Sequence, residues 1–415
     1  MSTGIQPVEL EVHRERLLSQ VVPLAPRQIE VAGGFAALHG AVLAEDVRST
    51  HPLPLWDNSA MDGYAVRSVD TAAAPVALDV IGEVPAGSGW DPKLEPGQCV
   101  KIMTGAPIPS DADAVVRIED TSAAVTGWDA ATVQIHVPVQ PGKDLRRRGE
   151  DKAAGQPVAH AGEQLTAARL SALAAAGASR LPVRTAPRVA VLITGAELLE
   201  PGKTLSRGQI PETNSLLMAG LLAESGIQAA TVVHCVDDTG AVREQLEELG
   251  STHDAILSTG GVGPGAYDVM RQVLDAEPGV QAARVKIRPG QPQCAGRLQA
   301  GAMVFALPGN PVSAAVSFEL FVRPCLRAMQ GHREVLRPTL RAIAAVGWKA
   351  AAGRLQVIPV VFEHGEQLRC APAVQASSIS HSVGGFGAAE GYALVPAGID
   401  RVNPGDGVEV LRMIP

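Results

Sequence analysis

The chain has 415 residues, of which 46% are hydrophobic and 19% charged, and its formal net charge is −8. This length exceeds one ordinary core and predicts roughly two to four domains. No run approaches the roughly 18 apolar residues of a membrane span, and the negative charge argues against a general nucleic-acid-binding protein. We therefore expect a modular protein with no membrane and no nucleic acid among its partners, and with a small-molecule ligand.

The N-terminal segment lacks a basic region followed by an apolar core and a cleavage site, which predicts a cytoplasmic protein. Five cysteines are widely spaced without a Cys-x-x-Cys pair, so they predict packed, reduced thiols and neither a disulfide framework nor a zinc site. These are Cys99, Cys235, Cys294, Cys325 and Cys370.

Three different sequence patterns follow one another in the first half of the chain. Residues 9–21 place their leucines and Val21 on roughly one helical face, and Pro23 ends the pattern. Residues 44–139 are short apolar runs broken by glycine and proline, which predicts a β-rich domain. A small-residue helical pattern, LTAARLSALAAAGAS, resumes after it. Helical segments on both sides of a β insertion indicate that the two flanks belong together.

A basic triplet, 146–148, closes the β-rich region. It has two interpretations, a phosphate-binding group or a solvated hairpin edge. The general behaviour of charge runs favours the second by about two to one.

Strand-like and helical runs alternate from 188 to 329, which predicts βαβ crossovers and a mostly parallel sheet. Ligands of such sheets lie beyond the carboxyl ends of the strands. Polar, glycine-rich turns follow four strands, at 194–198, 236–239, 259–265 and 308–313. Their backbone N–H groups suit phosphate.

The acids of these turns would repel an anion unless Mg²⁺ lies between them, which makes Glu197, Asp237, Asp238 and Asp268 candidate metal ligands. Any one such turn is more often structural, but four at one edge favour a site. A dinucleotide-binding or P-loop protein is disfavoured because neither G-x-G-x-x-G nor G-x-x-x-x-G-K-[ST] is present at the first turn or elsewhere.

The last unit, after His332, has short strands at regular spacing and predicts a small β-barrel or sandwich. Its polar island 376–385 is either a loop that reaches another site or a plain surface connection.

The motifs DNSAMDGYAV, KIMTGAPIP, RRRGED, TGAEL, TGGV, RPGQP and LPGNPVSA occur in this order. In this they resemble the MoeA family of molybdopterin molybdenumtransferases, which includes the E domain of gephyrin. The resemblance implies an α/β multidomain fold with four domains: a discontinuous helical lever (1–45 and 146–183), a β-rich domain (46–145), an α/β molybdopterin-binding domain (184–332) and a C-terminal β-barrel (333–415).

The resemblance also implies a function in molybdenum cofactor biosynthesis. The reaction is insertion of molybdate into adenylylated molybdopterin with Mg²⁺-dependent release of AMP. A homodimer is implied, in which Asp62, Thr104 and Asp151 of one chain face Glu197, Asp237 and Asp268 of the other; these six are the implied catalytic residues. Further implied partners are other cofactor-biosynthesis proteins and apo-molybdoenzymes in transient contact.

The substrate-binding residues implied by the resemblance come from seven segments, and the basic ones suit an oxyanion. They are Asn58, Ser59, Gly195, Asn214, Ser215, Thr259, Gly260, Gly261, Arg284, Lys286, Arg288, Pro308, Gly309, Asn310, Pro311, Ser313, Ser377 and Ser378.

The chain departs from the family pattern around this cleft. Ala196 replaces an aspartate, Gly263 a hydroxyl residue and Ala266 a common acid, while Arg288 and Gln291 replace lysines. Two alternatives therefore stay open beside the molybdenumtransferase. One is an enzyme for another oxyanion, such as tungstate, or another pterin nucleotide; the other is a non-catalytic molybdopterin-binding scaffold.

Overall fold

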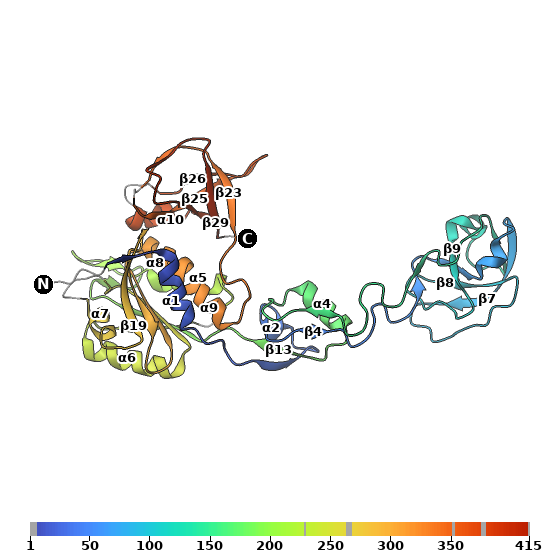
Figure 1. The fold of residues 1–415 in the computed structure, drawn as a ribbon, viewed down its shortest axis with the longest axis horizontal. Helices are drawn as coiled ribbons and strands as arrows, with labels where there is room; N and C mark the ends of the chain where they lie inside the picture. The colour runs from blue at the N-terminus through green and yellow to red at the C-terminus, as the bar shows by residue number, and fades with distance from the viewer. Residues whose placement is uncertain (1–5, 228–229, 263–267, 351–352, 375–378, 414–415) are drawn as a thin grey trace.

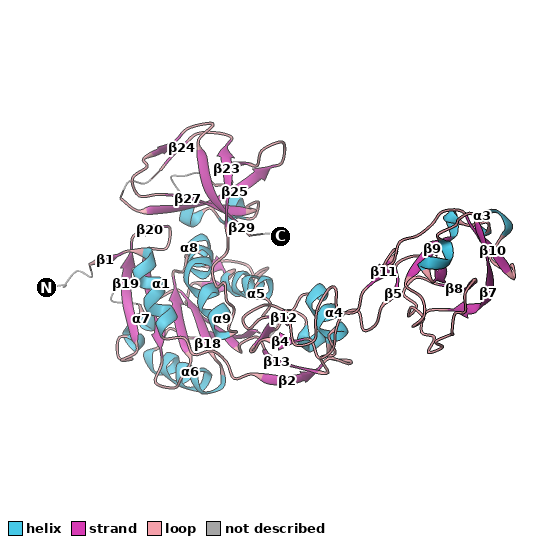
Figure 2. Cartoon of the chain, turned by 45° about the vertical axis from the view of Figure 1, so that its right-hand side comes forward, coloured by secondary structure: helices cyan, strands magenta, loops and turns pink. Residues whose placement is uncertain are grey.

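The computed structural model describes residues 6–227, 230–262, 268–350, 353–374 and 379–413. The chain is elongated: an α/β unit and a small β-barrel lie together at one end, a β-rich unit lies at the other, and a narrow connecting unit joins them (Figures 1 and 2). The predicted multidomain α/β fold is confirmed. Within the described ranges, no helix has both the length and the apolar character needed to cross a bilayer.

The α/β unit is built on a seven-stranded sheet with the order β1-β19-β21-β22-β18-β14-β17. The strands are β1 (Pro7–Val8), β19 (Val280–Val285), β21 (Pro292–Arg297), β22 (Met303–Leu307), β18 (Ala255–Thr259), β14 (Val189–Thr194) and β17 (Ala230–Cys235). β22, β18, β14 and β17 are mutually parallel, and β21 runs antiparallel to both of its neighbours. The mostly parallel sheet predicted from the sequence is thus present.

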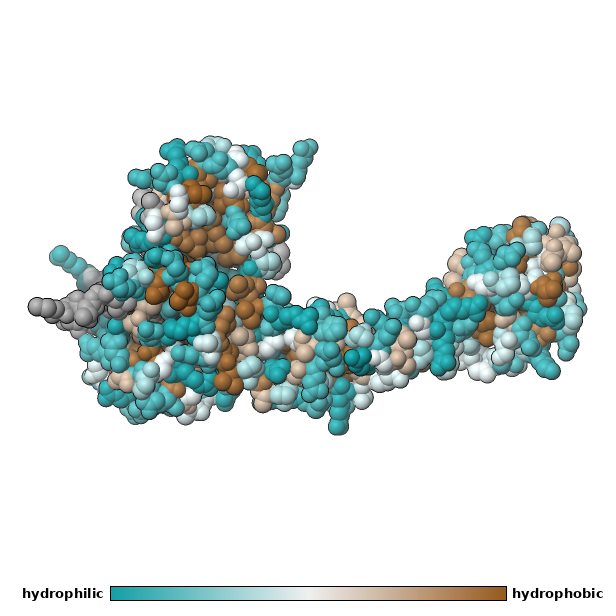
Figure 3. All heavy atoms as spheres, in the orientation of Figure 1, coloured by the Kyte–Doolittle hydropathy of each residue, from teal (hydrophilic) through white to brown (hydrophobic). Residues whose placement is uncertain are grey.

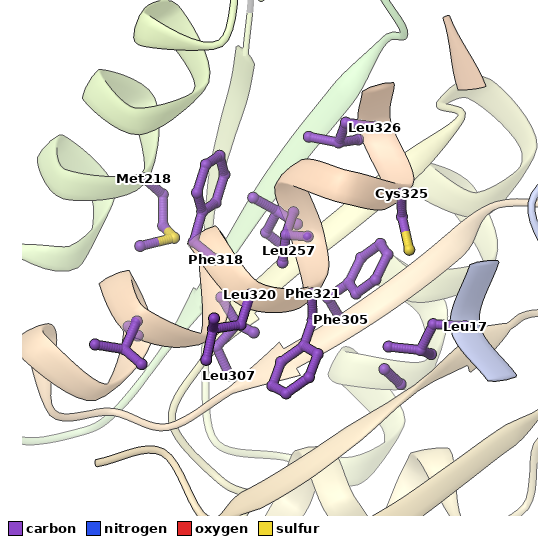
Figure 4. Close-up of a cluster of buried hydrophobic side chains, with 14 of the residues drawn as sticks. Leu17, Met218, Leu257, Phe305, Leu307, Phe318, Leu320, Phe321, Cys325 and Leu326 are labelled. Atoms are coloured by element: carbon purple, nitrogen blue, oxygen red, sulfur yellow. The ribbon is translucent and has the colours of Figure 1, made fainter. Parts of the chain in front are cut away.

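Helices cover both faces of this sheet, which is why β14, β18 and β22 are buried along their whole length. One face carries α1 (Leu10–Ser19), α5 (Asn214–Glu224), α8 (Pro311–Ser317), the π-helical turn η3 (Phe318–Val322) and α9 (Arg323–Met329); the other carries α6 (Thr239–Thr252) and α7 (Val269–Leu274). Figure 4 shows the first face, where Phe318 and Phe321 pack onto Leu257.

The N-terminal helix α1 packs on the α/β unit and not on the lever segment with which the sequence analysis grouped it. Leu10 and Leu17 belong to the core formed by β14, β18 and α9. The strand that precedes α1 extends the sheet, since Pro7 pairs with Arg284 of β19. The physical reason is the buried face of α1, which finds its apolar partners on the sheet.

The connecting unit contains two small sheets and two short helices, so it is less helical than the family resemblance implies. Its elements are β2 (Arg27–Glu30), α2 (Phe35–Leu38), β3 (Val42–Leu43), β4 (Val47–Arg48), β12 (Pro157–Ala159), α4 (Ala167–Ala175) and β13 (Arg180–Arg184). β13 pairs with β2 and β3, and β12 pairs with β4. The flanks of the β insertion therefore do share one core, which includes Leu43, Leu173 and Leu181.

The β-rich unit has a five-stranded sheet in the order β10-β7-β8-β6-β9, with a separate β5–β11 ladder where the chain enters and leaves. The elements are β5 (Asn58–Ser59), β6 (Gly63–Val66), η1 (Ser68–Thr71), β7 (Val76–Val84), β8 (Gln98–Ile102), β9 (Ala114–Arg117), η2 (Ile118–Asp120), α3 (Ala123–Thr126), β10 (Thr132–Ile135) and β11 (Leu145–Arg146). Tyr64 and Ala65 on β6 enter cores on opposite faces of the sheet. This confirms the predicted β-rich region.

The C-terminal unit is a closed five-stranded barrel, as the sequence predicts. β25 pairs with β27 through residues 356–360 and with β26 through 360–363, which closes the ring β25-β26-β23-β29-β27. Its elements are β23 (Thr339–Ala344), β24 (Trp348–Lys349), β25 (Leu355–Glu363), β26 (Arg369–Pro372), η4 (Ile379–His381), α10 (Val383–Phe386), β27 (Gly391–Val395), β28 (Arg401–Val402) and β29 (Gly407–Arg412). β20 (Ile287–Arg288), at the end of the α/β sheet, pairs with the start of β25 and ties the two units together.

Candidate active site

The four turns predicted to form a site do meet at the carboxyl edge of the parallel strands. The Ala196 N–H after β14 donates to the Asp237 carboxylate after β17, at 2.8 Å. Gly260 after β18 has a φ of +94° and its N–H donates to Leu307 at the end of β22, at 3.0 Å. This left-handed conformation suits glycine, since a side chain there would be strained.

Asn214, the first residue of α5, joins this helix to one of these turns. Its Nδ2 donates to the Gly309 carbonyl at 2.8 Å, so the start of α5 is held against the turn after β22. Its Oδ1 is buried and has no hydrogen-bond partner among the described residues, and the same holds for Thr259 Oγ1. Buried polar atoms without partners are costly unless a ligand or water satisfies them, so both atoms suit a binding site.

A cavity of about 510 Å³ opens beside the ends of β14 and β17. Ile193, Leu198 and Leu216 give it apolar walls, and Glu212 and Ser215 contribute polar atoms. The Glu212 carboxylate is only 4% exposed and accepts hydrogen bonds from both the N–H and the hydroxyl of Ser215. An apolar pocket with a few fixed polar groups is typical of a site for a heterocyclic ligand.

A second cavity, of about 320 Å³, lies between the α/β unit and the barrel. Arg288, Asn310 and Ser313 reach it from the α/β unit, whereas Arg354 and Ser380 reach it from the barrel. Arg288 and Arg354 supply two guanidinium groups, and none of the described residues that line it carries a carboxylate. Guanidinium groups bind tetrahedral oxyanions with paired hydrogen bonds, so this is the better place for a small anion.

The other two predicted basic residues lie apart from this cavity. Lys286 forms an ion pair with Glu9 at the N-terminal edge of the sheet. Arg284 lies on β19, in register with Pro7 of β1, and its side chain is exposed. Neither of them is among the residues that line the smaller cavity. Ser377 and Ser378 fall outside the described residues, as do Gly263 and Ala266.

The four predicted metal ligands do not form a cluster. Among the residues that the structure describes, no group of three or more His, Cys, Asp or Glu side chains is arranged to hold a metal ion. Glu197 and Asp237 border the same turn at 195–197, but Asp238 caps α6 by accepting from the Gly240 and Ala241 N–H groups. Asp268 lies at the start of α7, after the next parallel strand.

The predicted group at the start of the β-rich unit is assembled only in part. The Asp62 carboxylate accepts from the N–H and the hydroxyl of Thr104, at 2.6 and 2.8 Å. These hydrogen bonds, the backbone one first, lower the pKa of Asp62 below its ordinary value. Asp151 is exposed beside the same loop, and its backbone N–H donates a hydrogen bond to the Leu53 carbonyl at 3.1 Å.

Two other predicted substrate-binding residues of this loop serve the loop itself. Asn58 and Ser59 are buried, and their side chains donate to the carbonyls of Trp56 and Met61. The β-rich unit lies at the opposite end of the chain from the α/β unit (Figure 1). Within one chain, the Asp62–Thr104 pair is therefore far from Glu197 and Asp237.

Among the cavity residues that sequence reasoning missed are Glu212 and Arg354. Glu212 lies three residues before Ser215 and could have been recognised as a helix-capping acid. Arg354 is an isolated arginine at the start of a strand, and no sequence signal connects it with Arg288. All five cysteines lie in described residues and are free thiols; Cys235 borders the larger cavity and the other four are buried.

The fold and the two cavities define a multidomain α/β protein with one cavity at the carboxyl edge of its sheet and a second, arginine-lined cavity beside it. Three family models match the chain: the MoeA N-terminal region (domain I and II) at residues 8–177, the probable molybdopterin binding domain at 190–328, and the MoeA C-terminal region (domain IV) at 341–413. The chain belongs to the MoeA family.

Named relatives and solved structures agree with this assignment. The chain is 37% identical over 383 residues to molybdopterin molybdenumtransferase 2 of Mycobacterium tuberculosis, covering 89% of this chain and 92% of that protein. It is 31% identical over 424 residues to molybdopterin molybdenumtransferase 1 of the same species, covering 96% and 98%. A crystal structure of a molybdopterin biosynthesis MoeA protein from Pyrococcus horikoshii matches with a TM-score of 0.81 at 27% identity, covering 98% of this chain and 100% of that chain.

Proposed function

We propose that this protein is a molybdopterin molybdenumtransferase, which inserts molybdate into adenylylated molybdopterin and releases AMP. The observation that carries the proposal is the link between the two cavities. Ser215 lines the larger cavity, Asn310 lines the smaller one, and the hydrogen bond from Asn214 to Gly309 joins the two segments that carry them. One ligand bound along this edge would thus reach both an apolar ring pocket and a cationic oxyanion pocket.

Each part of the edge has a task in this reaction. Arg288 and Arg354 neutralise and orient the oxyanion in the smaller cavity. The larger cavity holds a ring system of the pterin nucleotide between Leu198 and Leu216. The phosphates lie over the turns between the cavities, where exposed backbone N–H groups supply directional contacts.

Glu197 and Asp237 fit a Mg²⁺ ion that is bound together with the substrate. Mg²⁺ in such sites is usually held by one or two carboxylates plus substrate phosphates, so a cluster of three protein acids is not required. The turn that these two residues border supplies two carboxylates of this kind. Bound Mg²⁺ would neutralise the negative charge of the phosphoanhydride. Ala196 removes a third carboxylate but keeps the N–H that holds Asp237 in place.

A homodimer with shared sites is part of the proposal. The Asp62–Thr104 pair lies within a surface on which four large apolar side chains are exposed, namely Leu55 (39%), Trp56 (60%), Met61 (37%) and Met103 (38%). Hydrophobic side chains are visible at the surface of the β-rich unit in Figure 3. An apolar rim around a polar centre suits a protein interface, and the α/β unit of a second copy would bring Glu197 to that centre.

The reaction is tested by measuring AMP release from adenylylated molybdopterin, with molybdate and Mg²⁺ each present or omitted, coupled to reconstitution of an apo-molybdoenzyme. We expect release and active cofactor only when both ions are present, and we expect Glu197→Ala to abolish both while the protein stays folded. Competition by tungstate distinguishes an enzyme for another oxyanion. Tight binding of the pterin nucleotide without release would refute catalysis and favour a scaffold.

The shared site has its own test, in which Asp62→Ala and Glu197→Ala variants are mixed by unfolding and refolding together. Each variant alone is expected to be inactive. Random reassociation makes half of the dimers mixed, and each mixed dimer has one intact site of two, so about a quarter of the activity should return. No recovery from a mixture that forms mixed dimers would refute the shared site. The cytoplasmic location remains a prediction from the sequence.

A further inference from the structure

The smaller cavity is built from two structural units, so its shape depends on how the barrel is oriented on the α/β unit. Arg288 and Ser313 belong to the α/β unit, whereas Arg354 belongs to the barrel. The β20–β25 pairing, Ile287 with Leu355 and Arg288 with Gln356, fixes one edge of this interface beside the cavity. Apolar packing of Val357 and Leu411 against the α/β core adds to this ladder, but apolar packing is non-directional, so a directional attachment further fixes the distance between the guanidinium groups.

Arg337 provides such an attachment. It lies in the segment between α9 and β23, and its Nε and Nη2 donate to the two carboxylate oxygens of Glu319 at 3.0 and 3.2 Å. Its Nη1 donates to the carbonyl of Arg412, the last residue of β29, at 3.0 Å. One planar guanidinium thereby connects the π-helical turn η3 of the α/β unit with the final strand of the barrel, and only arginine offers this fork of donors.

This contact is buried and directional. Glu319 is 8% exposed, and the Arg337 side chain is 20% exposed. Tyr392 of β27 is fully buried against the same pair, so the barrel contributes a large apolar contact there too. In such surroundings a two-point hydrogen-bonded ion pair keeps a fixed geometry, whereas an exposed pair would be screened and mobile.

The second attachment lies on the helix that reaches the cavity. α8 begins at the cavity, where Ser313 lines it, and continues without a break into η3, which carries Glu319. Ser313 and Glu319 are six positions apart, which is roughly 9 Å along a helix. The Arg337–Glu319 pair therefore fixes the barrel relative to a helix that lines the cavity, in addition to the β20–β25 ladder.

We propose that Arg337 is a positioning residue for oxyanion binding: by tying Glu319 to β29 it holds the barrel so that Arg354 faces Arg288. This inference rests on the proposed function, because it takes the smaller cavity as the oxyanion site. It predicts that loss of Arg337 weakens oxyanion binding and spares the larger cavity, whose lining belongs to the α/β unit alone.

The test compares the wild type with Arg337→Gln and with Arg341→Gln, which removes the same charge from an exposed position on β23. Calorimetry measures the dissociation constants of molybdate and, separately, of AMP as a probe of the larger cavity. We expect Arg337→Gln to raise the dissociation constant of molybdate at least tenfold and to change that of AMP less than twofold. Arg341→Gln should change neither dissociation constant. Hydrogen exchange of β25 should accelerate in Arg337→Gln alone.

If Arg337→Gln does not fold, Arg337→Met replaces it, because methionine is apolar and flexible and Glu319 keeps its ion pair with Arg323 at 3.6 Å. The same weakening of molybdate binding is expected, since the directional contact to β29 is gone. An unchanged molybdate constant in a folded variant would overturn the inference and leave the proposed function intact. A wild type that binds no oxyanion would overturn both.

Discussion

Acid should loosen the packing of the N-terminal helix through His13. This side chain is 2% exposed, its ring contacts Phe321 edge-on at 5.0 Å between centroids, and its Nε2 has no hydrogen-bond partner among the described residues. Burial, followed by the charge of Arg16, lowers its pKa from 6.5 to about 4. The folded protein therefore holds His13 neutral under conditions in which the unfolded chain would protonate it.

The sign and size of the effect follow from this difference in pKa. Because the folded pKa is depressed, the stabilisation is complete above pH 6.5 and is lost as the pH falls towards 4. Linkage gives a loss of about 2 kcal/mol at pH 5 and about 3 kcal/mol below pH 4. His332, whose pKa burial also lowers to about 4, adds a parallel loss that is common to the variants compared.

Native-state hydrogen exchange of α1 at pH 7.5 and 5.0, corrected for intrinsic exchange, measures this loss. His13→Leu keeps the apolar contact and removes the titration, so α1 should lose about 2 kcal/mol less protection on acidification than in the wild type. His364→Leu, at an exposed position of the barrel, is the matched control and should behave as the wild type does. An equal loss in wild type and His13→Leu would refute the reasoning.

Three further outcomes are expected. Arg354→Gln should raise the molybdate dissociation constant about 10- to 100-fold, the value of one charged hydrogen-bonding group, without changing AMP affinity in calorimetry; an unchanged constant would contradict the oxyanion assignment. Gly63→Ala should destabilise the β-rich unit by about 3 kcal/mol or more, because the new Cβ would lie 2.0 Å from the Val116 carbonyl oxygen. The fluorescence of Trp128, which packs against Tyr64, reports the unfolding of this unit. Ala196→Asp adds a carboxylate while its N–H still holds Asp237, so AMP release should reach half its maximal rate at a lower Mg²⁺ concentration; a higher requirement would argue against metal binding at this turn.

The sequence was sufficient to predict features that depend on local pattern. The buried runs of β14, β18 and β22 predict a parallel sheet, and polar turns after parallel strands must share an edge, where the structure does bring 194–198 and 236–239 together. The barrel follows from regularly spaced short strands in the same way.

Features that depend on pairing between distant segments could not be predicted. The pattern of α1 shows that one face is buried, but only the tertiary fold shows that this face packs on the sheet and not on the connecting unit. Arg354 has no motif, and it reaches the smaller cavity because β25 pairs with β20. Lys286 has the right charge and the right neighbourhood in sequence, yet in the fold it forms an ion pair with Glu9.

The same distinction explains why Ala196 is compatible with a working site. A carboxylate at this position would be one of several acids that can contact a metal, and its loss removes one side chain. The geometry of the turn depends on its backbone, since the Ala196 N–H is the group that holds the Asp237 carboxylate. An N–H is present in alanine and aspartate alike, so the substitution leaves Asp237 oriented and changes only the number of oxygens near the phosphates. This departure from the family pattern should therefore alter the affinity for Mg²⁺ more than the position of the substrate.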